Sequence, residues 1–185
     1  MRFTERYANH YTLEDISTVD FKYKNAEGIP YNEGGTPRHY ISLWLDPEVA
    51  EAMKDLGFNV QVKEDSYNKL GVRPYCNFSM KPGVRYNRRT DKEEFSPKVV
   101  MKTPTKTRRL RSAKSFSNID KSLIEHADMS FRSYEYEPGK WSLIIEGFWF
   151  STADSVGTGE PDFDEAYGYN EPDIEPDEDE EDAPF

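Results

Sequence analysis

The sequence predicts a mostly β domain, a small barrel of about five strands with one or two short helices. Several segments alternate apolar and polar residues with a period of two, the pattern of a half-buried strand. Helical features are confined to two short segments, 46–57 and 119–127. The intervening segments are rich in Gly, Pro and basic residues, which predicts long basic loops.

The first clear strand is predicted at 38–45. Ile41 and Leu43 fall on one face of this segment, and Tyr40 and Trp44 fall on the other. The aliphatic face suits a core. An aromatic opposite face is unusual for a surface that meets only water.

A helix is predicted at 46–57. Asp46 is a favourable N-cap residue, Pro47 suits the first helical position, and Gly57 suits the position after the last turn. The other expected elements, in chain order, are at most one strand or short helix before a loop at 28–37, strands at 58–63 and 75–81, a short strand at 99–101, a mobile basic arm or loop at 103–114, a short helix at 119–127, and a hairpin of 129–136 with 141–150. Five or so strands with a capping helix indicate an OB-like barrel, the commonest fold of this class that binds oligonucleotides.

The charge is divided between two parts of the chain. The 185 residues include 24 basic and 35 acidic side chains, which gives a net charge of −11. Residues 151–185 contain fourteen Asp and Glu and no Lys or Arg, so residues 1–150 carry a net charge of +3. We therefore expect an OB-like domain at 1–150 and a disordered acidic tail at 151–185.

The sequence also predicts a cellular location. Cys76 is the single cysteine, so an internal disulfide framework is excluded and a reducing compartment is indicated. No apolar run approaches the roughly 18 residues of a membrane span. Residues 1–6 lack the apolar region of a signal peptide. We expect a cytoplasmic protein with no membrane partner.

No catalytic constellation is visible in the sequence. His10, His39 and His126 are not at metal-ligand spacing, and each is expected to be structural. Gly34 and Gly35 precede neither a phosphate-loop motif nor a helix. Acidic residues cluster almost entirely in the tail, where no scaffold would fix their geometry for metal-assisted chemistry. We expect a protein that is not an enzyme and has no cofactor and no metal.

Residues 67–114 have the composition of a surface for single-stranded nucleic acid. They contain fourteen basic and three acidic residues, interleaved with tyrosines. Cations neutralise phosphates in such surfaces, and bases stack on exposed aromatic side chains. Solvated charge and half-buried aromatics are also normal on β-barrels, and the aromatics of 129–150 are expected in the core or at a subunit interface. The candidate DNA-binding residues are Tyr40, Trp44, Lys69, Arg73, Tyr75, Lys81, Arg85, Tyr86, Arg88, Arg89, Lys106, Arg108, Arg109 and Arg111.

The acidic tail allows three interpretations. It is a solubilising segment, or it competes with nucleic acid for the basic groove, or its end is recognised by a partner. In the third case the ring of Phe185 enters an apolar pocket, and basic residues around that pocket bind the carboxylates.

The chain end carries a family resemblance. Asp182, Ala183, Pro184 and Phe185, preceded by an acidic run, resemble the acidic Pro-Phe tip of bacterial single-stranded DNA-binding proteins, with Ala183 where the familiar tip has Ile. The block 45–63 and the hairpin 129–150 look like the phage-encoded OB proteins of this family, and the lack of a long Gly/Gln-rich linker favours the phage type. The resemblance implies a domain that coats single strands during replication, recombination and repair, in the host cytoplasm, with a tip that recruits replication or recombination proteins.

The sequence thus predicts a single-stranded DNA-binding protein without sequence preference, with homo-oligomerisation left open. One alternative is a protein-interaction factor whose acidic tail mimics nucleic acid and occupies a partner's basic groove. A weaker alternative is a metal-dependent nuclease.

Overall fold

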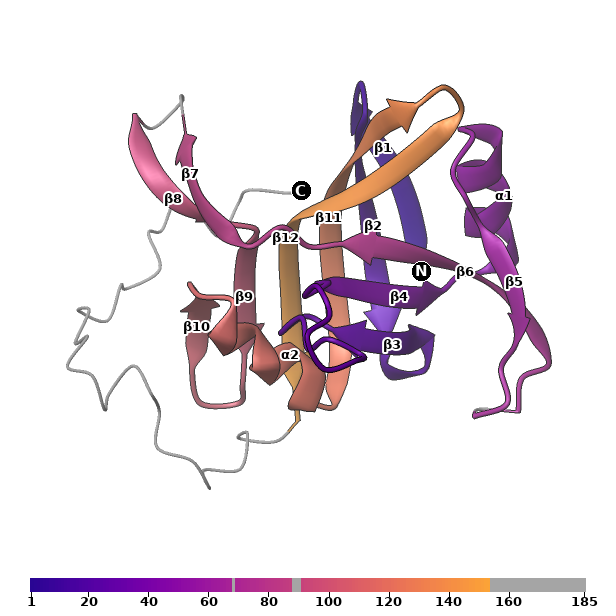
Figure 1. Cartoon of the computed structure of the whole chain (residues 1–185). Helices are drawn as coiled ribbons and strands as arrows, with labels where there is room; N and C mark the ends of the chain where they lie inside the picture. The colour runs from indigo at the N-terminus through magenta and orange to yellow at the C-terminus, as the bar shows by residue number, and fades with distance from the viewer. Residues whose placement is uncertain (68, 88–90, 154–185) are drawn as a thin grey trace.

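The structure is a computed structural model, and it describes residues 1–67, 69–87 and 91–153. It is mostly β with two short α-helices, α1 (Pro47–Asp55) and α2 (Ser117–Lys121), so the predicted class is confirmed (Figure 1). Within these residues no helix has the length and apolar character needed to cross a bilayer. All of the predicted tail beyond Ala153 lies outside the described residues.

Twelve strands form two sheets within the described residues. Their bounds are β1 (Arg2–Tyr7), β2 (His10–Ser17), β3 (Phe21–Asn25), β4 (Tyr40–Trp44), β5 (Gln61–Glu64), β6 (Val72–Ser79), β7 (Gly83–Asn87), β8 (Lys92–Ser96), β9 (Lys98–Lys102), β10 (Thr107–Leu110), β11 (Ile124–Glu137) and β12 (Lys140–Thr152). The main sheet has the order β1-β2-β11-β12-β6-β4-β3, to which β5 adds on β6, β9 adds on β12, and β10 adds on β9. Strands β7 and β8 form a separate hairpin that projects from the body (Figure 1).

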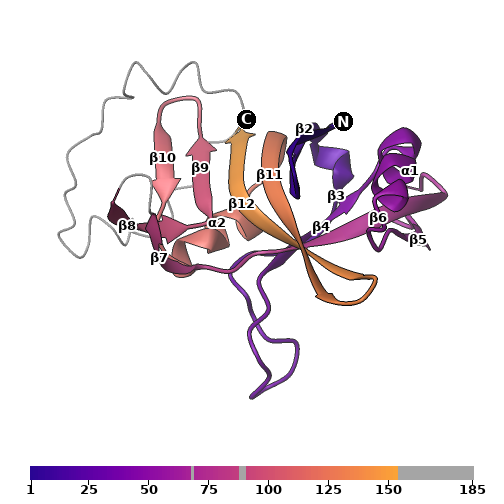
Figure 2. The same ribbon diagram turned by 90° about the horizontal axis from the view of Figure 1, so that it is seen from above.

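The predicted five-stranded barrel is wrong. The ten-stranded sheet is not closed, because in the described part of the chain β1 pairs with β2 alone and β3 pairs with β4 alone. Closure would require a ladder between these two edge strands. The sheet instead curls, so that β1 and β2 lie behind β3, β4 and β6 (Figures 1 and 2).

The hydrophobic core lies between the two layers of the curled sheet. Phe78 of β6 meets Phe131 of β11 edge-on at 5.0 Å between ring centroids, and Tyr11 of β2 stacks on Phe131 at 5.4 Å. Cys76 and Phe78 are buried, as their alternation along β6 predicts. The core therefore forms where rings from three non-consecutive strands meet.

The first 25 residues form three strands, whereas the sequence predicted at most one element there. The period is broken by bulges, which insert an extra residue and exchange the faces of the residues that follow. The β1–β2 register shifts between Glu5 and Tyr7. Asp15, inside β2, has a φ of 59° opposite a register shift between Ala127 and Met129.

Two predictions in the second half of the chain are also wrong. The expected mobile arm at 103–114 includes β10, which pairs with β9 and buries Leu110. The expected helix at 119–127 ends at Lys121, because the chain from Ile124 onward pairs with β2 and β12. Tertiary pairing thus overrides the local helical pattern. The predicted hairpin of 129–136 with 141–150 is confirmed and is longer than expected.

Helix α1 begins and ends where the sequence predicts. Asp46 is the N-cap residue, although its carboxylate pairs with the amino group of Met1 at 3.0 Å and makes no side-chain cap. Gly57 has a φ of 81°, which favours glycine at the helix end. The strand predicted at 58–63 forms only from Gln61 as β5, since Phe58 still donates its backbone N–H to Met53 at the end of the helix.

Arg73 holds β6 to the rest of the sheet. Its guanidinium lies 3.2 Å from the carboxylate of Asp65 and 3.4 Å from that of Asp20, and it donates to the backbone carbonyl of Val19. The Asp65 side chain is only 1% exposed. Arg73 was expected to bind phosphate; in the structure its guanidinium is paired with these two carboxylates.

We predict that the thiol of Cys76 is inert in the folded protein. Burial raises its pKa to about 12, so almost no thiolate forms near neutral pH. Titration with a thiol reagent should give no reaction in buffer and one thiol per chain in denaturant. Rapid labelling of the native protein would contradict the buried position.

We predict that Arg73→Ala lowers the free energy of unfolding by about 3 kcal/mol, because it leaves a buried carboxylate without this cation. Urea unfolding measures the loss. Lys69→Ala, at an exposed position of the β5–β6 turn, is the control and should change stability by less than about 0.5 kcal/mol. Equal unfolding midpoints for the two variants would refute the structural role.

Candidate single-stranded nucleic-acid interface

The outward face of β4 and β6 forms the floor of a groove. Residues along a strand alternate between its two faces, so those between the core residues of β4 and β6 point away from the core. The antiparallel register places them opposite one another, Tyr40 with Ser79, Ser42 with Asn77 and Trp44 with Tyr75. The same alternation that builds the core therefore also builds this surface.

Two projecting segments flank this face. The loop between β3 and β4 and the tip of the β11–β12 hairpin extend from the same side of the sheet (Figure 2). A hollow of about 700 Å³ lies on the loop side and one of about 210 Å³ on the hairpin side, and both include Tyr75, Asn77 and Ser79. We call the two together the β6 groove. Its other residues are Lys22, Tyr23, Tyr31, Pro37, Arg38, His39, Tyr40, Ser42, Met80 and Lys81 on the loop side, and Asn59, Gln61, Cys76, Tyr136, Trp141, Ser142 and Leu143 on the hairpin side.

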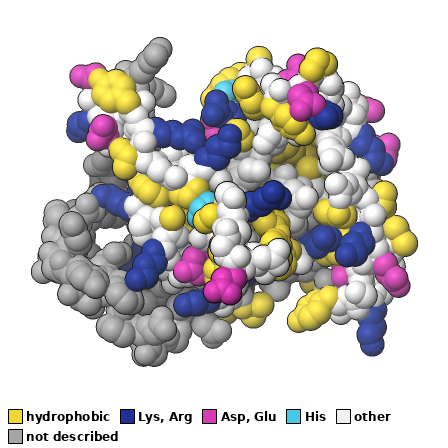
Figure 3. Space-filling model, in the orientation of Figure 1, with side chains coloured by type: hydrophobic (Ala, Val, Ile, Leu, Met, Phe, Trp, Pro, Cys, Tyr) yellow, Lys and Arg dark blue, Asp and Glu magenta, His cyan; other side chains and the backbone are white. Residues whose placement is uncertain are grey.

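The groove is positively charged on its loop side. Lys22, Arg38 and Lys81 line this side, and no Asp or Glu is among the described residues that line either hollow. In the space-filling view, Lys and Arg side chains lie among hydrophobic side chains on the same face (Figure 3). Cations beside aromatic rings, without carboxylates, attract a ligand that combines negative charge with flat rings.

Three tyrosines form a stack at the loop side. Tyr23 lies between Tyr31 and Tyr40, with ring centroids 6.2 Å and 5.6 Å away. The hydroxyl groups of Tyr31 and Tyr40 are hydrogen-bonded to each other. Hydrogen bonding to Tyr31 raises the pKa of Tyr23, and hydrogen bonding to Tyr40 raises that of Tyr31, so both phenols stay neutral at physiological pH. Tyr31 is 68% exposed and offers a ring to a further stacked group.

A bulge brings Lys22 and Tyr23 to the same groove. Successive residues of a strand normally face opposite ways, but the β3–β4 register shifts between Phe21 and Tyr23. The ammonium of Lys22 lies 4.0 Å from the ring centroid of Tyr75. Burial lowers the pKa of Lys22, with a smaller contribution from the nearby charge of Lys63.

The structure places Trp44 beneath this surface. Trp44 is 4% exposed, with Lys22 and Arg73 over its ring at 5.5 Å and 5.6 Å and Tyr75 packed edge-on. Stacking of a base directly on Trp44 does not fit this burial. Trp44 supports Tyr75 from below, whereas Tyr40 and Tyr75 line the groove as the sequence led us to expect.

The remaining predicted residues lie in several places. Lys81 lines the groove. The others are Lys69 on the β5–β6 turn, Arg85 and Tyr86 on β7, and Lys106, Arg108, Arg109 and Arg111 on or beside the β9–β10 hairpin. Arg88, Arg89 and the tip residues Asp182, Ala183, Pro184 and Phe185 lie outside the described residues. The basic segment 67–114 is therefore distributed over separate hairpins.

Several groove residues were missed by the sequence analysis. Tyr23 follows a bulge, so the alternation of apolar and polar residues did not indicate which face of the sheet it lies on. Tyr31 and Arg38 lie in or beside a segment that its Gly and Pro content marked only as a loop. Tyr136 and Trp141 were expected in the core or at a subunit interface; both line the groove, and Tyr136 is exposed. An aromatic residue within a Gly/Pro-rich loop was the one available signal.

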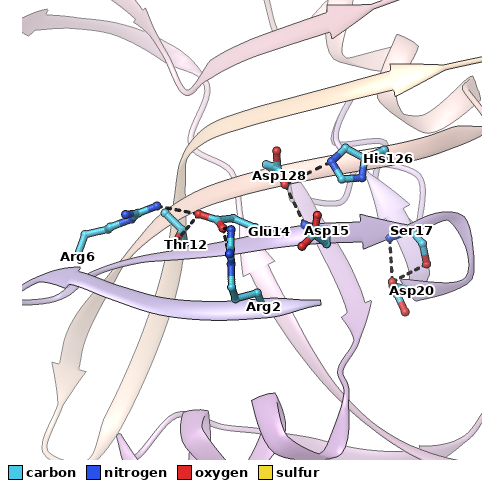
Figure 4. A network of polar contacts seen from close by, with 9 residues as sticks. All are labelled: Arg2, Arg6, Thr12, Glu14, Asp15, Ser17, Asp20, His126 and Asp128. Atoms are coloured by element: carbon cyan, nitrogen blue, oxygen red, sulfur yellow. Dashed lines mark hydrogen bonds and ion pairs between the residues drawn. The ribbon is translucent and has the colours of Figure 1, made fainter. Parts of the chain in front are cut away.

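A separate polar group lies between β2 and β11 (Figure 4). Donor atoms of Asp15, His126 and Asp128 lie within 4.8 Å of one another, a spacing that would suit a metal ion. The carboxylate of Asp128 accepts the backbone N–H of Asp15 at 2.9 Å and lies 3.6 Å from His126. These contacts explain the group as a support for the bulge at Asp15, and none of the three residues lines the β6 groove.

Comparison with known proteins gives remote similarities only. No family model and no characterised protein matches the sequence. Among solved structures, the chain is similar to a single-stranded DNA-binding protein from bacteriophage Enc34, with 14% identity and a TM-score of 0.42 over 90% of this chain and 99% of that chain. A structure of the Enc34 protein in complex with ssDNA gives 14% and 0.41, over 84% of this chain and 97% of that chain. The gp2.5 single-stranded DNA-binding protein of bacteriophage T7 gives 11% and 0.36, over 90% and 98%. TM-scores this low assign neither a fold nor a function to this chain.

Proposed function

We propose that this protein binds single-stranded DNA in the β6 groove. The observation that supports the proposal is the lining of the groove, where three cations and several tyrosines and a tryptophan converge without a carboxylate. A ligand that satisfies both kinds of group has phosphates and flat rings at short, regular spacing. Single-stranded nucleic acid has this chemistry.

The two kinds of side chain have different tasks. Lys22, Arg38 and Lys81 neutralise phosphates and release condensed counterions, so binding weakens as salt rises. Tyr31 offers an exposed ring face on which a base stacks, and Tyr75 offers a second when Lys22 moves away from its ring. Each stack contributes about 1–3 kcal/mol, and stacking of this kind tolerates any base. The strand is held by its backbone charge and its base faces.

The same geometry disfavours a duplex. Tyr75 and Tyr40 lie on the floor of the groove, between the β3–β4 loop and the β11–β12 tip. In a duplex the base faces are stacked on one another, and only base edges are accessible in the grooves. A single strand can turn its bases toward the tyrosines.

The basic hairpins extend the phosphate-binding surface in this proposal. Arg85 on β7 and Lys106 at the β9–β10 turn are exposed. Cations at a distance from the groove attract the strand and hold its flanks through long-range charge rather than through fixed contacts. These cations make the affinity more dependent on salt concentration and give the protein no preference among bases.

The tail has two roles in this proposal. Its fourteen acidic residues compete with DNA for the basic groove, and its Pro184-Phe185 tip recruits replication or recombination proteins. Both roles rest on the sequence, in which all of the excess negative charge lies beyond residue 150.

We predict saturable binding of oligo-dT at low salt, followed by tryptophan fluorescence, to which Trp141 in the lining of the groove contributes. Tyr31→Ala should weaken binding about 5- to 150-fold, because it removes one stacking face. Arg38→Ala should reduce the slope of log affinity against log salt by about one.

The matched control is Tyr7→Ala, which removes a tyrosine that is 65% exposed on β1, outside the groove. It should leave the affinity within about twofold, since its ring contacts no ligand in this proposal. The absence of saturable oligo-dT binding to the wild-type protein would rule the function out.

We predict that a chain ending at residue 153 binds oligo-dT more tightly than the full chain, with the largest gain at low salt, where charge competition is least screened. A chain lacking only Pro184 and Phe185 is the control. It keeps all fourteen acidic residues, so it should retain the weaker affinity of the full chain and lose partner binding in a pull-down. Equal affinities for the full and truncated chains would exclude the competition.

A further inference from the structure

The hairpin side of the β6 groove differs chemically from the loop side. Its hollow of about 210 Å³ is lined by aromatic, amide and hydroxyl side chains, and no charged residue is among its described lining. A phosphate finds no cation there. An uncharged ring with hydrogen-bonding edges suits this lining, and on the proposed function that ring is a nucleobase.

The orientation of Asn77 is set by a neighbour in the groove floor. The hydroxyl of Ser42, on the neighbouring strand, donates a hydrogen bond to Oδ1 of Asn77. Ser42 is buried and lines the same groove, so this bond lies within the floor. It uses one lone pair of the amide oxygen and leaves both hydrogens of the Nδ2–H₂ group as donors for a ligand.

Gln61 is fixed in the same way. The phenol of Tyr75 donates a hydrogen bond to Oε1 of Gln61, which uses one lone pair of that oxygen and leaves both hydrogens of Nε2–H₂ as donors for a ligand. Tyr75 and Gln61 are opposite residues of the β5–β6 ladder, so the backbone holds the pair in register. Two amides on adjacent strands thus both present donors to one hollow.

Aromatic rings form the sides of this hollow. Trp141 and Tyr136 come from the β11–β12 hairpin, and Tyr75 comes from β6. Trp141 packs edge-on against Phe58 at 6.2 Å between ring centroids. The indole therefore contacts the body of the protein before any ligand arrives.

We propose that this hollow is a base subsite that selects bases with carbonyl acceptors, above all thymine, over adenine. Thymine has two carbonyl oxygens that accept from the amides of Gln61 and Asn77. Adenine has one ring-nitrogen acceptor beside its amino group, so it can accept from one of these amides but places a donor opposite the other. A donor without an acceptor loses its hydrogen bond to water and gains nothing in return.

This inference rests on the proposed function and adds a preference to it. Stacking along the rest of the groove accepts any base, so the strand still binds without a defined sequence. The hairpin-side subsite adds a bias at one position of the bound strand. In a homopolymer the same base occupies this subsite wherever the strand is placed along the groove, so the preference appears in the overall affinity.

The test compares oligo-dT with an oligonucleotide of the same length made of difluorotoluene nucleotides, a nonpolar isostere with the shape of thymine and without its acceptors. The full-length wild-type protein should prefer oligo-dT about tenfold, as expected for two hydrogen bonds. Affinity for oligo-dA is measured as well. The bases of free oligo-dA stack on one another, and the cost of breaking this stacking is the same for wild type and variants. It therefore cancels when the affinities of a variant and of wild type are compared.

Gln61→Met keeps the length of the side chain and removes its donor, and Asn77→Leu does the same at the second amide. Each variant should reduce the preference for thymine over the isostere about threefold, and the pair should abolish it. Tyr31→Ala is the matched control, which lowers affinity for both oligonucleotides by the same factor. Because Gln61 and Asn77 are exposed, the variants should fold; urea unfolding verifies this, and Gln61→Met alone suffices if Asn77→Leu is unstable.

Equal wild-type affinity for thymine and its isostere would overturn the subsite and leave the proposed function intact. A preference that survives in both amide variants would also overturn it. Failure of the wild-type protein to bind any of the oligonucleotides would overturn the proposed function instead.

Discussion

The alternation of side chains along β6 is the constraint on which both the core and the groove depend. This strand is hydrogen-bonded to β4, β5 and β12, so it joins the layers of the curled sheet. Its inward residues, Cys76 and Phe78, are buried. Its outward residues, Tyr75 and Asn77, line both hollows. Because a strand has a period of two, a shift of one residue would place the groove residues in the core and the core residues in solvent. The core and the groove are thus coupled through one register.

Segments with an unbroken local pattern were predictable from the sequence. The alternation at 38–45, the cap signals around Asp46 and the long hairpin all reappear in the structure. The first 25 residues were not predictable, because their pairing depends on bulges such as the one at Asp15, and a bulge is fixed by the neighbouring strand. The prediction of a barrel was wrong for a related reason. Closure of a sheet depends on which strands lie at its edges, and no local sequence pattern determines which strands these are.

The sequence predicted the types of residue in the candidate site but not which residues come together there. Composition indicated cations with aromatics between 67 and 114, and Tyr75 and Lys81 do lie in the groove. Charge alone cannot tell a phosphate ligand from a buried ion pair, and Arg73 belongs to the second class because Asp65 and Asp20 approach it in space. Tyr31 and Trp141, more than 100 residues apart, reach one groove only through the order of the strands. The order of the strands also places the cations on one side of that groove and Gln61 and Asn59 on the other.

On the proposed function, the position of Lys22 over the ring of Tyr75 has a consequence for how a DNA strand binds in the groove. The ammonium group occupies the ring face at 4.0 Å, so a base can reach that face only when the lysine moves aside. Its flexible stem allows the movement, and a phosphate of the arriving strand gives the displaced charge a new partner. Binding at this position exchanges one contact for two. The cation–π contact between Lys22 and Tyr75 is lost, while a base stacks on Tyr75 and a phosphate pairs with Lys22. A ligand with rings but no charge, or with charge but no rings, completes only half of the exchange.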